Sequence, residues 1–476
     1  MNHWKNFIAG KWCDSETHLD VIDPSTGKAF ATIACASLND ANKALDLARD
    51  CADSNELTRE HPSQRVKLML RIAENIRELT EEGKNLLAKE NGKSLSDSRD
   101  EFLTAARYFE YYAGMADKIE GKSIPLGDDY MDFTLYEPVG VSVQIVPWNF
   151  PFDICARSLA PALAAGNAVI IKSPEITPLA ITLMATACQK AGLTDNALSI
   201  LCGSGSIIGD ALVSSPKVDQ ITFTGSVPTG QQILKSAAMN ATPCVMELGG
   251  KSAAILFDDA DINQFLSSVA FGIFFNAGQV CSAMSRILVH RSIYHEVISA
   301  VEQLAKQVLT SSHPEVELTP VISEKQLSQI QQKCDTAIEE GARLIAGGKV
   351  LPDREGYFFE PTIFADVTPE MDLFLHEVFG PVVAITSFDT EEEAYQLANA
   401  TQFGLVSGVF TRDLSRALRA SRALKSGQIF VNEWFAGGIE TPFGGVKLSG
   451  FGREKGQEAL YSYVNTKNIA IKVSKD

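Results

Sequence analysis

The chain lacks the features that mark membrane, secreted and nucleic-acid-binding proteins. Its longest apolar runs, such as Ala168–Ile171, have the length of a strand and not of a bilayer span. Residues 1–22 mix Lys, Trp, Asp and Glu without an apolar block, which is not the pattern of a signal peptide. The net charge of −17 leaves no basic stripe for a phosphate backbone. We therefore expect neither a membrane nor a nucleic-acid partner.

Cysteine and histidine are too scattered to predict a disulfide framework or a metal site. The nine cysteines are odd in number and never occur in CxxC spacing. None of the seven histidines is grouped with a cysteine. This usage is typical of reduced thiols in the cytoplasm, so we expect a cytoplasmic protein without a metal.

The size and composition of the chain favour a large globular protein. A length of 476 residues predicts two or three domains. The hydrophobic fraction of 45% and the charged fraction of 21% are ordinary for folded proteins and exclude a disordered chain.

The pattern of apolar residues changes near residue 139. Residues 1–22 resemble short strands, and helical periodicity dominates residues 37–116, where an apolar stripe runs through Gln64–Leu79. After residue 139, buried strands alternate with helices, which predicts an α/β fold with parallel sheets covered on both faces. The expected strands are Val139–Val146, Ala168–Lys172, Leu198–Leu201, Gln220–Phe223, Ser252–Phe257, Arg286–Val289, Val382–Thr386, Ser407–Phe410 and Gln428–Val431. The expected helices between the first four are Asp153–Ala165, Pro178–Ala191 and Gly209–Ser214.

One of the nine cysteines stands in a context suited to nucleophilic catalysis. Cys281 follows an apolar stretch that breaks into Ala-Gly-Gln, and Gly278 allows backbone to pass close to a substrate. Taken alone, any single cysteine is more simply explained as a small buried hydrophobic residue. Cys281 therefore needs catalytic partners before a role can be assigned.

Two further residues could supply such partners. Glu247 ends a short apolar strand before Gly249 and Gly250, and apolar neighbours can turn a carboxylate into a usable base. Asn149 lies between two prolines after a buried strand, where its amide could donate to an oxyanion. A solvated glutamate and a turn asparagine are the simpler explanations of each residue in isolation.

A possible anion site follows the strand at residues 220–223. A glycine turn at Gly225 and Ser226 leads into a helix start, where backbone N–H groups can bind phosphate. The spacing Gly-x-x-x-x-Gly is not the usual dinucleotide fingerprint. Lys172 and Glu175 follow an earlier strand and could hold ribose hydroxyls, although a solvated ion pair explains them equally well.

Together, over most of the chain, these motifs resemble those of the aldehyde dehydrogenase superfamily. The matching segments are PWNFP, FTGS, ELGGK, GQVCSA, EVFGP and PFGGVKLSGFGRE. The resemblance implies a Rossmann-type cofactor domain, an α/β catalytic domain and a small β arm that joins subunits into a homodimer or homotetramer. We place the NAD-binding domain at residues 1–118 and 138–249, the catalytic domain at 250–448, and the oligomerisation arm at 119–137 and 462–476.

The resemblance also implies roles for individual residues. Cys281 matches the nucleophile, Glu247 the general base, and Asn149 the oxyanion donor, which the backbone N–H of Cys281 assists. The matched cofactor contacts are Trp148, Lys172, Glu175, Gly225, Ser226, Leu248, Glu377 and Phe379. The implied reaction is NAD-dependent oxidation of an aldehyde to its acid through a thiohemiacetal and a thioester on Cys281.

Two features narrow the expected chemistry. A base at Glu247 argues against transfer of the thioester to coenzyme A, because the base activates water instead. Glu175 would repel the 2′-phosphate of NADP by like charge, so we expect NAD to be preferred.

The expected substrate is less sharply defined. Arg157 matches a position that lines the substrate tunnel, and succinic semialdehyde dehydrogenases have an arginine there that helps to hold the substrate carboxylate. Those enzymes resemble one another in having a second arginine as well. This chain has Phe275 at the position of that second arginine. With Phe150 and Phe443 also near the tunnel, we expect an aromatic or apolar aldehyde, and a succinic-semialdehyde-type activity is the alternative. A helix arginine paired with a nearby acid explains Arg157 equally well.

Ser158 is a departure from the family pattern. Many members have a lysine at this position, which is proposed to relay protons together with a C-terminal glutamate. Here the glutamate is retained as Glu454 but the lysine is absent. A non-catalytic scaffold on the same fold is a further hypothesis, but it predicts loss of the nucleophile, the base or the oxyanion donor, and all three are present.

Overall fold

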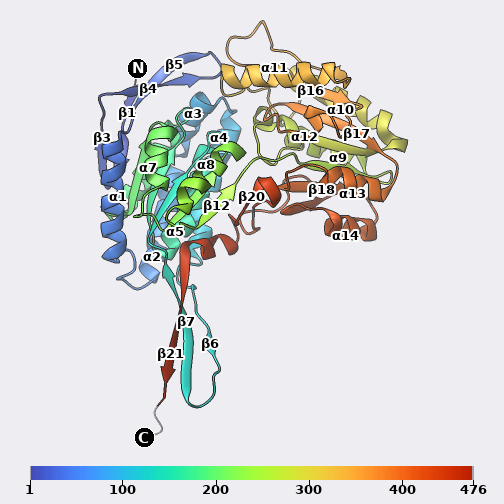
Figure 1. The fold of residues 1–476 in the computed structure, drawn as a ribbon. Coiled ribbons are helices and arrows are strands. Elements are labelled where there is room, and N and C mark those ends of the chain that lie inside the picture. Colours follow the sequence, from blue (N-terminus) through green and yellow to red (C-terminus); the bar gives the residue numbers. More distant parts are fainter. Residues whose placement is uncertain (1, 474–476) are drawn as a thin grey trace.

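The computed structural model describes residues 2–473 as two large sheets with helices packed on them and a slender arm. Figure 1 shows the two sheets in separate lobes, with the arm extending from the lobe that contains the N-terminal half of the chain. This architecture confirms the predicted α/β fold with a small β arm. The division into domains at the boundaries given above stays a prediction. Residues 474–476, which we assigned to the arm, lie outside the described residues.

The first sheet has eight strands in the order β20-β12-β11-β8-β9-β10-β2-β3. The five strands from β12 to β10 run parallel, as predicted, whereas β20, β2 and β3 pair in antiparallel fashion at the edges. The strands of this sheet are β2 (Asn6–Ile8), β3 (Lys11–Cys13), β8 (Val141–Ile145), β9 (Ala168–Ser173), β10 (Leu198–Cys202), β11 (Gln220–Thr224), β12 (Cys244–Glu247) and β20 (Gly450–Phe451).

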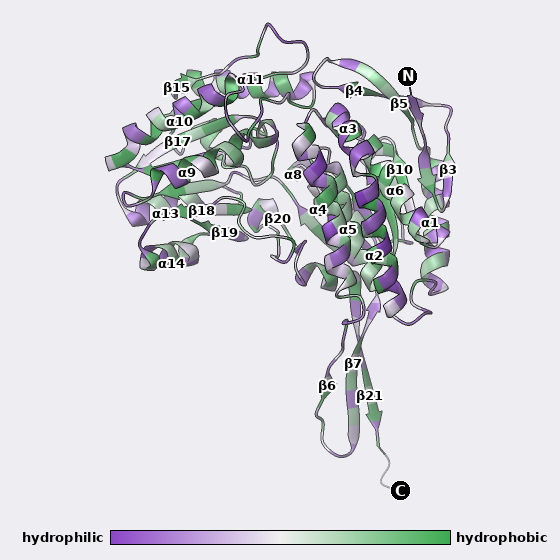
Figure 2. Ribbon diagram, turned by 180° about the vertical axis from the view of Figure 1, so that it is seen from behind, coloured by the Kyte–Doolittle hydropathy of each residue, from purple (hydrophilic) through white to green (hydrophobic). Residues whose placement is uncertain are grey.

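Eight helices of the described residues accompany this sheet, some with one buried face and others, such as Pro151–Ala165, buried almost all round. They are α1 (Leu38–Asp53), α2 (Ser63–Glu78), α3 (Thr80–Asn91), α4 (Leu95–Ala113), α5 (Pro151–Ala165), α6 (Leu179–Ala191), α7 (Asp210–Val213) and α8 (Val227–Ala238). Figure 2 shows hydrophilic and hydrophobic residues alternating around α2 and α4. The apolar stripe predicted through Val66, Met69, Leu70, Ala73 and Ile76 was wrong at one position, because Leu70 is 47% exposed.

Some predicted element bounds differ from the observed ones. The helix α5 begins at Pro151 and not at Asp153, because proline suits the first turn of a helix. The helix predicted at Gly209–Ser214 extends further toward the N-terminus, as a π-helical turn over Gly205–Gly209 that continues into α7.

The second sheet has seven strands in the order β15-β16-β17-β14-β13-β18-β19. All pairs are parallel except β15 with β16. The strands are β13 (Ala253–Leu256), β14 (Arg286–His290), β15 (Arg343–Ala346), β16 (Thr362–Ala365), β17 (Val382–Phe388), β18 (Val406–Phe410) and β19 (Gln428–Val431). The helices are α9 (Ile262–Val269), α10 (Tyr294–Leu309), α11 (Glu324–Glu339), α12 (Asp372–Leu375), α13 (Glu391–Asn399) and α14 (Leu414–Ala423).

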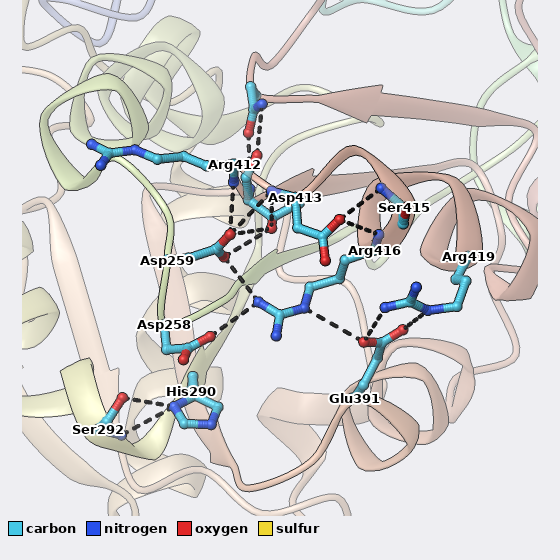
Figure 3. Close-up of polar contacts among 12 residues, drawn as sticks. Asp258, Asp259, His290, Ser292, Glu391, Arg412, Asp413, Ser415, Arg416 and Arg419 are labelled. Atoms are coloured by element: carbon cyan, nitrogen blue, oxygen red, sulfur yellow. Dashed lines mark hydrogen bonds and ion pairs between the residues drawn. The ribbon is translucent and has the colours of Figure 1, made fainter.

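A network of charged side chains fixes α14 to the loop after β13 (Figure 3). The guanidinium of Arg416 lies 3.0 Å from Asp258 and 2.9 Å from Asp259. Arg419 makes two hydrogen bonds to Glu391 at the start of α13, of 2.7 and 3.0 Å. These contacts join three segments of the second lobe that are far apart in the sequence.

The arm consists of β6 (Ser123–Ile124), β7 (Tyr130–Pro138) and β21 (Val464–Lys472), in the order β21-β7-β6. It projects away from the lobes (Figure 1) and exposes large apolar side chains, including those of Met131 and Ile471. A further small sheet contains β1 (Asn2–Trp4), β5 (Lys28–Ala34) and β4 (His18–Asp23). Among the residues the structure describes, no helix combines the length and apolar character needed to cross a bilayer.

Candidate active site

The carboxyl ends of the parallel strands in the first sheet meet at one edge. The strands β8, β9, β11 and β12 all end there, and the residues that follow them line a cavity of about 470 Å³. Ligands of open parallel sheets bind at this edge, because the loops that leave the strands can surround them. The sheet therefore brings together motifs that are up to 100 residues apart in the chain.

All the predicted catalytic and cofactor residues line this one cavity. It contains the three proposed catalytic residues, Asn149, Glu247 and Cys281. It also contains all the proposed cofactor contacts, which are Trp148, Lys172, Glu175, Gly225, Ser226, Leu248, Glu377 and Phe379.

The segment before Cys281 has an unusual backbone. Asn276, Ala277 and Gly278 have successive φ angles of +49°, +52° and +71°. Such left-handed residues are costly outside glycine, and they persist only where the surroundings enforce them. A Cβ on Gly278 would lie 2.1 Å from the carbonyl oxygen of Gly380, so this position excludes a side chain. The strain is concentrated directly before the candidate nucleophile.

The thiol of Cys281 is held in a low-dielectric environment. Burial raises its pKa to about 12, while the positive charge of Arg157 and the backbone N–H of Ser282 act in the opposite direction. The negative charges of Glu377 and Glu247 raise the pKa further. The thiol is therefore protonated in the absence of ligands, and Arg157 is the positive charge that favours its ionisation.

The amide of Asn149 points toward the segment that contains Cys281. Its Nδ2 donates a hydrogen bond of 2.9 Å to the carbonyl oxygen of Gln279. An amide nitrogen carries two hydrogens, so a second one can be donated to another acceptor. The side chain is only 5% exposed, and a substrate oxygen meeting it would be shielded from water.

Glu247 is buried at the end of β12 without a hydrogen-bond partner for either carboxylate oxygen among the described residues. Burial raises the pKa of this carboxyl well above its usual range, and the charge of Glu454 raises it further. The charges of Arg157 and Arg453 lower it. A raised pKa makes an ionised carboxylate a stronger base, and its two free oxygens leave room for a water molecule whose proton it can accept.

Arg157 and Glu454 form a buried ion pair behind the cavity. Arg157 does not line the cavity itself, and its Nη2 also lies 3.4 Å from the hydroxyl oxygen of Thr224. Ser158 donates a hydrogen bond of 2.7 Å to Glu454, so the serine that replaces the family's lysine contacts the same glutamate. The guanidinium is therefore already paired with an acid.

Cys281 packs against an apolar cluster that contains aromatic side chains. The rings of Phe150 and Phe275 stack with their centroids 5.9 Å apart, and both pack against the apolar cluster that contains Phe443. The guanidinium of Arg157 lies 5.3 Å from the centre of the Phe443 ring. Phe150, Phe275, Phe443 and Arg157 lie outside the 470 Å³ cavity, so their predicted role in substrate binding stays a prediction.

A second cavity of about 410 Å³ continues from the first between α7 and α8. Ile145, Lys172 and Thr229 line both cavities, which provides room for an elongated dinucleotide. Glu175 lies between them, where its Oε1 accepts hydrogen bonds from Gly205 N–H, at 2.8 Å, and from Lys172, at 3.3 Å. The arrangement of donors, acceptors and space fits NAD.

The opposite end of the first cavity contains Glu377 and Phe379. Glu377 accepts a hydrogen bond of 2.9 Å from the backbone N–H of Gly250, and burial raises its pKa to about 7. The ring of Phe379 lies edge-on to Trp148 at 5.3 Å. Gln326 on α11 holds this segment by donating to the carbonyl oxygen of Phe379 at 2.9 Å.

The sequence interpretation missed several residues that line the cavities. Gln326 had no recognisable signal, because it lies about 50 residues from the segment it contacts. Thr229 could have been found, since it lies one helical turn after Ser226 and contacts its hydroxyl at 3.0 Å. The other missed residues include Ile145, Pro147, Ile176, Gly205, Ser206 and Gln232.

Comparisons with known proteins agree with this geometry. The model of the aldehyde dehydrogenase family matches residues 12–469. Aldehyde dehydrogenase family 2 member B4, a mitochondrial protein of Arabidopsis thaliana, is 39% identical over 481 residues, covering 100% of this chain and 89% of the relative. Betaine aldehyde dehydrogenase of Bacillus subtilis strain 168 is 37% identical over 472 residues, covering 97% of this chain and 96% of the relative.

The fold is also similar to that of solved enzymes. The crystal structure of betaine aldehyde dehydrogenase from Staphylococcus aureus in complex with NAD⁺ matches with a TM-score of 0.95 and 36% identity, covering 98% of this chain and 94% of that chain. With the family match, the cavity and the placement of its residues, this likeness establishes the class of enzyme. The chain belongs to the aldehyde dehydrogenase family.

Proposed function

We propose that Cys281, Glu247 and Asn149 carry out the oxidation of an aldehyde to its carboxylic acid. The observation that supports this most strongly is that one cavity holds all three residues together with the proposed cofactor contacts. A nucleophile, a base and an oxyanion donor in one water-restricted site are the components that acyl chemistry through a thioester requires.

In the first step, the thiolate of Cys281 adds to the aldehyde carbon, and the carbonyl oxygen becomes an oxyanion. The free hydrogen of the Asn149 amide and the backbone N–H of Cys281 stabilise this charge. NAD, when bound, accepts the hydride that leaves the carbon. The product of this step on the enzyme is a thioester of Cys281.

In the second step, Glu247 removes a proton from water, and the hydroxide attacks the thioester carbon. The carboxylate product leaves, and the sulfur of Cys281 is regenerated. The free oxygens of Glu247 support this assignment, since no described side chain competes for them. Burial raises the pKa of Glu247 most, and the opposite charges of Glu454 and Arg157 adjust it in opposite directions.

The two cavities support specific cofactor contacts. We assign the adenosine ribose to Lys172 and Glu175, and the pyrophosphate to the helix start at Gly225 and Ser226, near Trp148. Leu248, Glu377 and Phe379 would hold the nicotinamide ribose and ring. The charge of Glu175 favours NAD over NADP, because a 2′-phosphate would approach it.

For the substrate, we propose an aromatic or apolar aldehyde. Phe150 and Phe275 stack on each other and pack against the same apolar cluster as Cys281, and apolar rings of this kind favour an apolar substrate tail. The succinic-semialdehyde alternative depends on Arg157, whose charge is already opposed by Glu454. The pairing of Arg157 thus supports the aromatic or apolar substrate over the carboxylated one.

A coupled assay of NADH formation tests these assignments. Benzaldehyde, hexanal, succinic semialdehyde and betaine aldehyde are compared at equal concentration with wild type, Cys281→Ala and Arg157→Met. We expect the highest kcat/KM for benzaldehyde or hexanal and loss of turnover in Cys281→Ala. A selective loss on succinic semialdehyde in Arg157→Met would favour the carboxylated substrate instead.

We also propose that the arm joins subunits into a homodimer or homotetramer. Its exposed apolar residues include Ile124, Leu126, Tyr130, Met131, Leu135 and Ile471. A two- or three-stranded ribbon has little core of its own, and apolar residues on it indicate a surface that a partner covers.

A further inference from the structure

Three potential metal ligands gather on the small N-terminal sheet, apart from the active-site cavity. His3, Asp14 and His18 each offer one ligand atom, and these atoms all lie within 4.8 Å of one another. None of the three residues lines the cavity that contains Cys281. Figure 1 shows the sheet of β1, β4 and β5 at the margin of the first lobe. The cluster is therefore independent of the proposed catalytic reaction.

The register of the sheet places the two histidines on the same face. His3 in β1 lies opposite Thr32 in β5, and His18 in β4 lies opposite Ala34. Thr32 and Ala34 are two residues apart, so they share a face of the strand. The imidazole rings meet above β5 with their centroids 4.4 Å apart. Backbone pairing thus brings the ligands together before any metal binds.

Asp14 completes the group from the segment after β3. Its Oδ1 lies 2.8 Å from the Nε2 atom of His3 and 3.4 Å from the Nε2 atom of His18. In a four-coordinate zinc site with bonds of about 2.0–2.1 Å, neighbouring ligand atoms are about 3.3 Å apart. The observed distances are close to this spacing, and small rotations of exposed side chains can adjust them.

Hydrogen bonds around the cluster orient its side chains for metal binding. The Nε2 atom of His3 makes a hydrogen bond with Asp14, and Nδ1 lies 3.0 Å from the hydroxyl oxygen of Thr32. A metal that takes the place of the Nε2 proton can therefore leave the ring proton on Nδ1, where the oxygen of Thr32 accepts it. The backbone N–H of Ser15 donates to Asp14 Oδ1 at 2.9 Å, which orients the carboxylate. Lys5 lies 3.5 Å from the other carboxylate oxygen, Oδ2, and is the cation that opposes metal binding.

We propose that His3, Asp14 and His18 bind a divalent transition-metal ion such as Zn²⁺ through two imidazole nitrogens and one carboxylate oxygen. Exposures of 31%, 45% and 42% for the three side chains leave room for water to complete the coordination. The ion would join three segments that are separate in the sequence, namely β1, the residues that follow β3, and β4. Nitrogen and oxygen ligands without sulfur suit zinc, nickel or copper and not calcium or magnesium.

Zinc titration of the chelator-treated, full-length protein tests the proposal. A chromogenic indicator competes for Zn²⁺, and wild type is compared with His3→Gln, His18→Gln and the matched control His61→Gln, another exposed histidine. We expect wild type and the control to bind one zinc equivalent more than either cluster variant. Zinc held by cysteine thiols is common to all four proteins and cancels in the comparison.

Two further measurements keep the test decisive. Thr32→Val should weaken zinc binding by about 10–100-fold, because it removes the group that orients His3. Added Zn²⁺ should raise the Tm of wild type but not of Asp14→Asn, which retains both histidines. Equal zinc binding by wild type, His3→Gln and His18→Gln would overturn the proposal and leave the cluster as an ordinary group of hydrogen-bonded surface side chains.

Discussion

Arg157 and Glu454 form a buried ion pair whose two charges act in opposite directions on the pKa of Glu247. Neither residue is adjacent to Glu247 in the sequence, and α5 and the segment after β20 bring them together. Ser158 donates to Glu454 from the position where many family members have a lysine. In this chain positive charge near the base comes from Arg157, the residue before this serine, and from Arg453.

This pair predicts opposite shifts of the pH–rate profile. Arg157 lowers the pKa of both Cys281 and Glu247, and both groups are active when deprotonated. Arg157→Met should therefore move the rising limb of kcat/KM to higher pH. Glu454 raises the pKa of Glu247. Glu454→Gln should therefore move the rising limb of the pH profile of kcat, to which deacylation contributes, to lower pH. Shifts in the same direction would contradict the account.

The same pair predicts a change in stability. Arg157→Met leaves the carboxylate of Glu454 buried without its cation, which should lower the free energy of unfolding by about 3–5 kcal/mol. The double variant Arg157→Met/Glu454→Gln removes both charges and should recover much of this loss. Urea unfolding followed by circular dichroism measures both effects. If the double variant is less stable than Arg157→Met, the unpaired charge of Glu454 does not cause the loss of unfolding free energy.

Cofactor choice should depend on Glu175. Glu175→Gln removes the negative charge between the two cavities but keeps a similar shape, so the kcat/KM ratio of NADP to NAD should rise. A rise of about tenfold corresponds to about 1.4 kcal/mol. Steady-state kinetics with both cofactors at saturating aldehyde measure it, with Asp210→Asn in the second cavity as a control. An unchanged ratio would remove Glu175 as the discriminating residue.

Assembly should depend on the apolar surface of the arm. Met131 and Ile471 are cross-strand partners, and both are exposed. The double variant Met131→Lys/Ile471→Glu replaces them with an opposite-charge pair that keeps the strands paired. Light scattering after size-exclusion chromatography should show a smaller particle. Met239→Glu, at a site that is 83% exposed away from the arm, should leave the size unchanged.

Motifs near strand ends could be predicted from the sequence, because a buried strand fixes where its last residues point. Glu247 and Asn149 follow β12 and β8, and the parallel pairing of the sheet brings them to the same edge. Short strands were expected within residues 1–22, but the antiparallel pairing of β2 with β10 was not predicted, and neither was the two-residue strand β20, since their partners are distant in the sequence.

Contacts made between distant segments could not be predicted in the same way. Gln326 reaches Phe379 from a helix with no motif of its own, and the left-handed backbone at Ala277 has no signature in residue type. The pairing of Arg157 with Glu454 was one of two explanations that the sequence left open. In each case the determining information is tertiary packing and not local pattern.

The central claim is that Cys281 carries the acyl group during turnover, and trapping that group tests it most directly. Glu247→Gln lacks the base for hydrolysis, and general-base catalysis contributes about 10²–10⁴-fold, so the thioester should accumulate. The variant is mixed with benzaldehyde and NAD, quenched in acid and digested for mass spectrometry. We predict a rapid burst of NADH and a benzoyl group on the peptide that contains Cys281. A burst of NADH without an acyl group on Cys281, or with the group on another cysteine, would contradict the account.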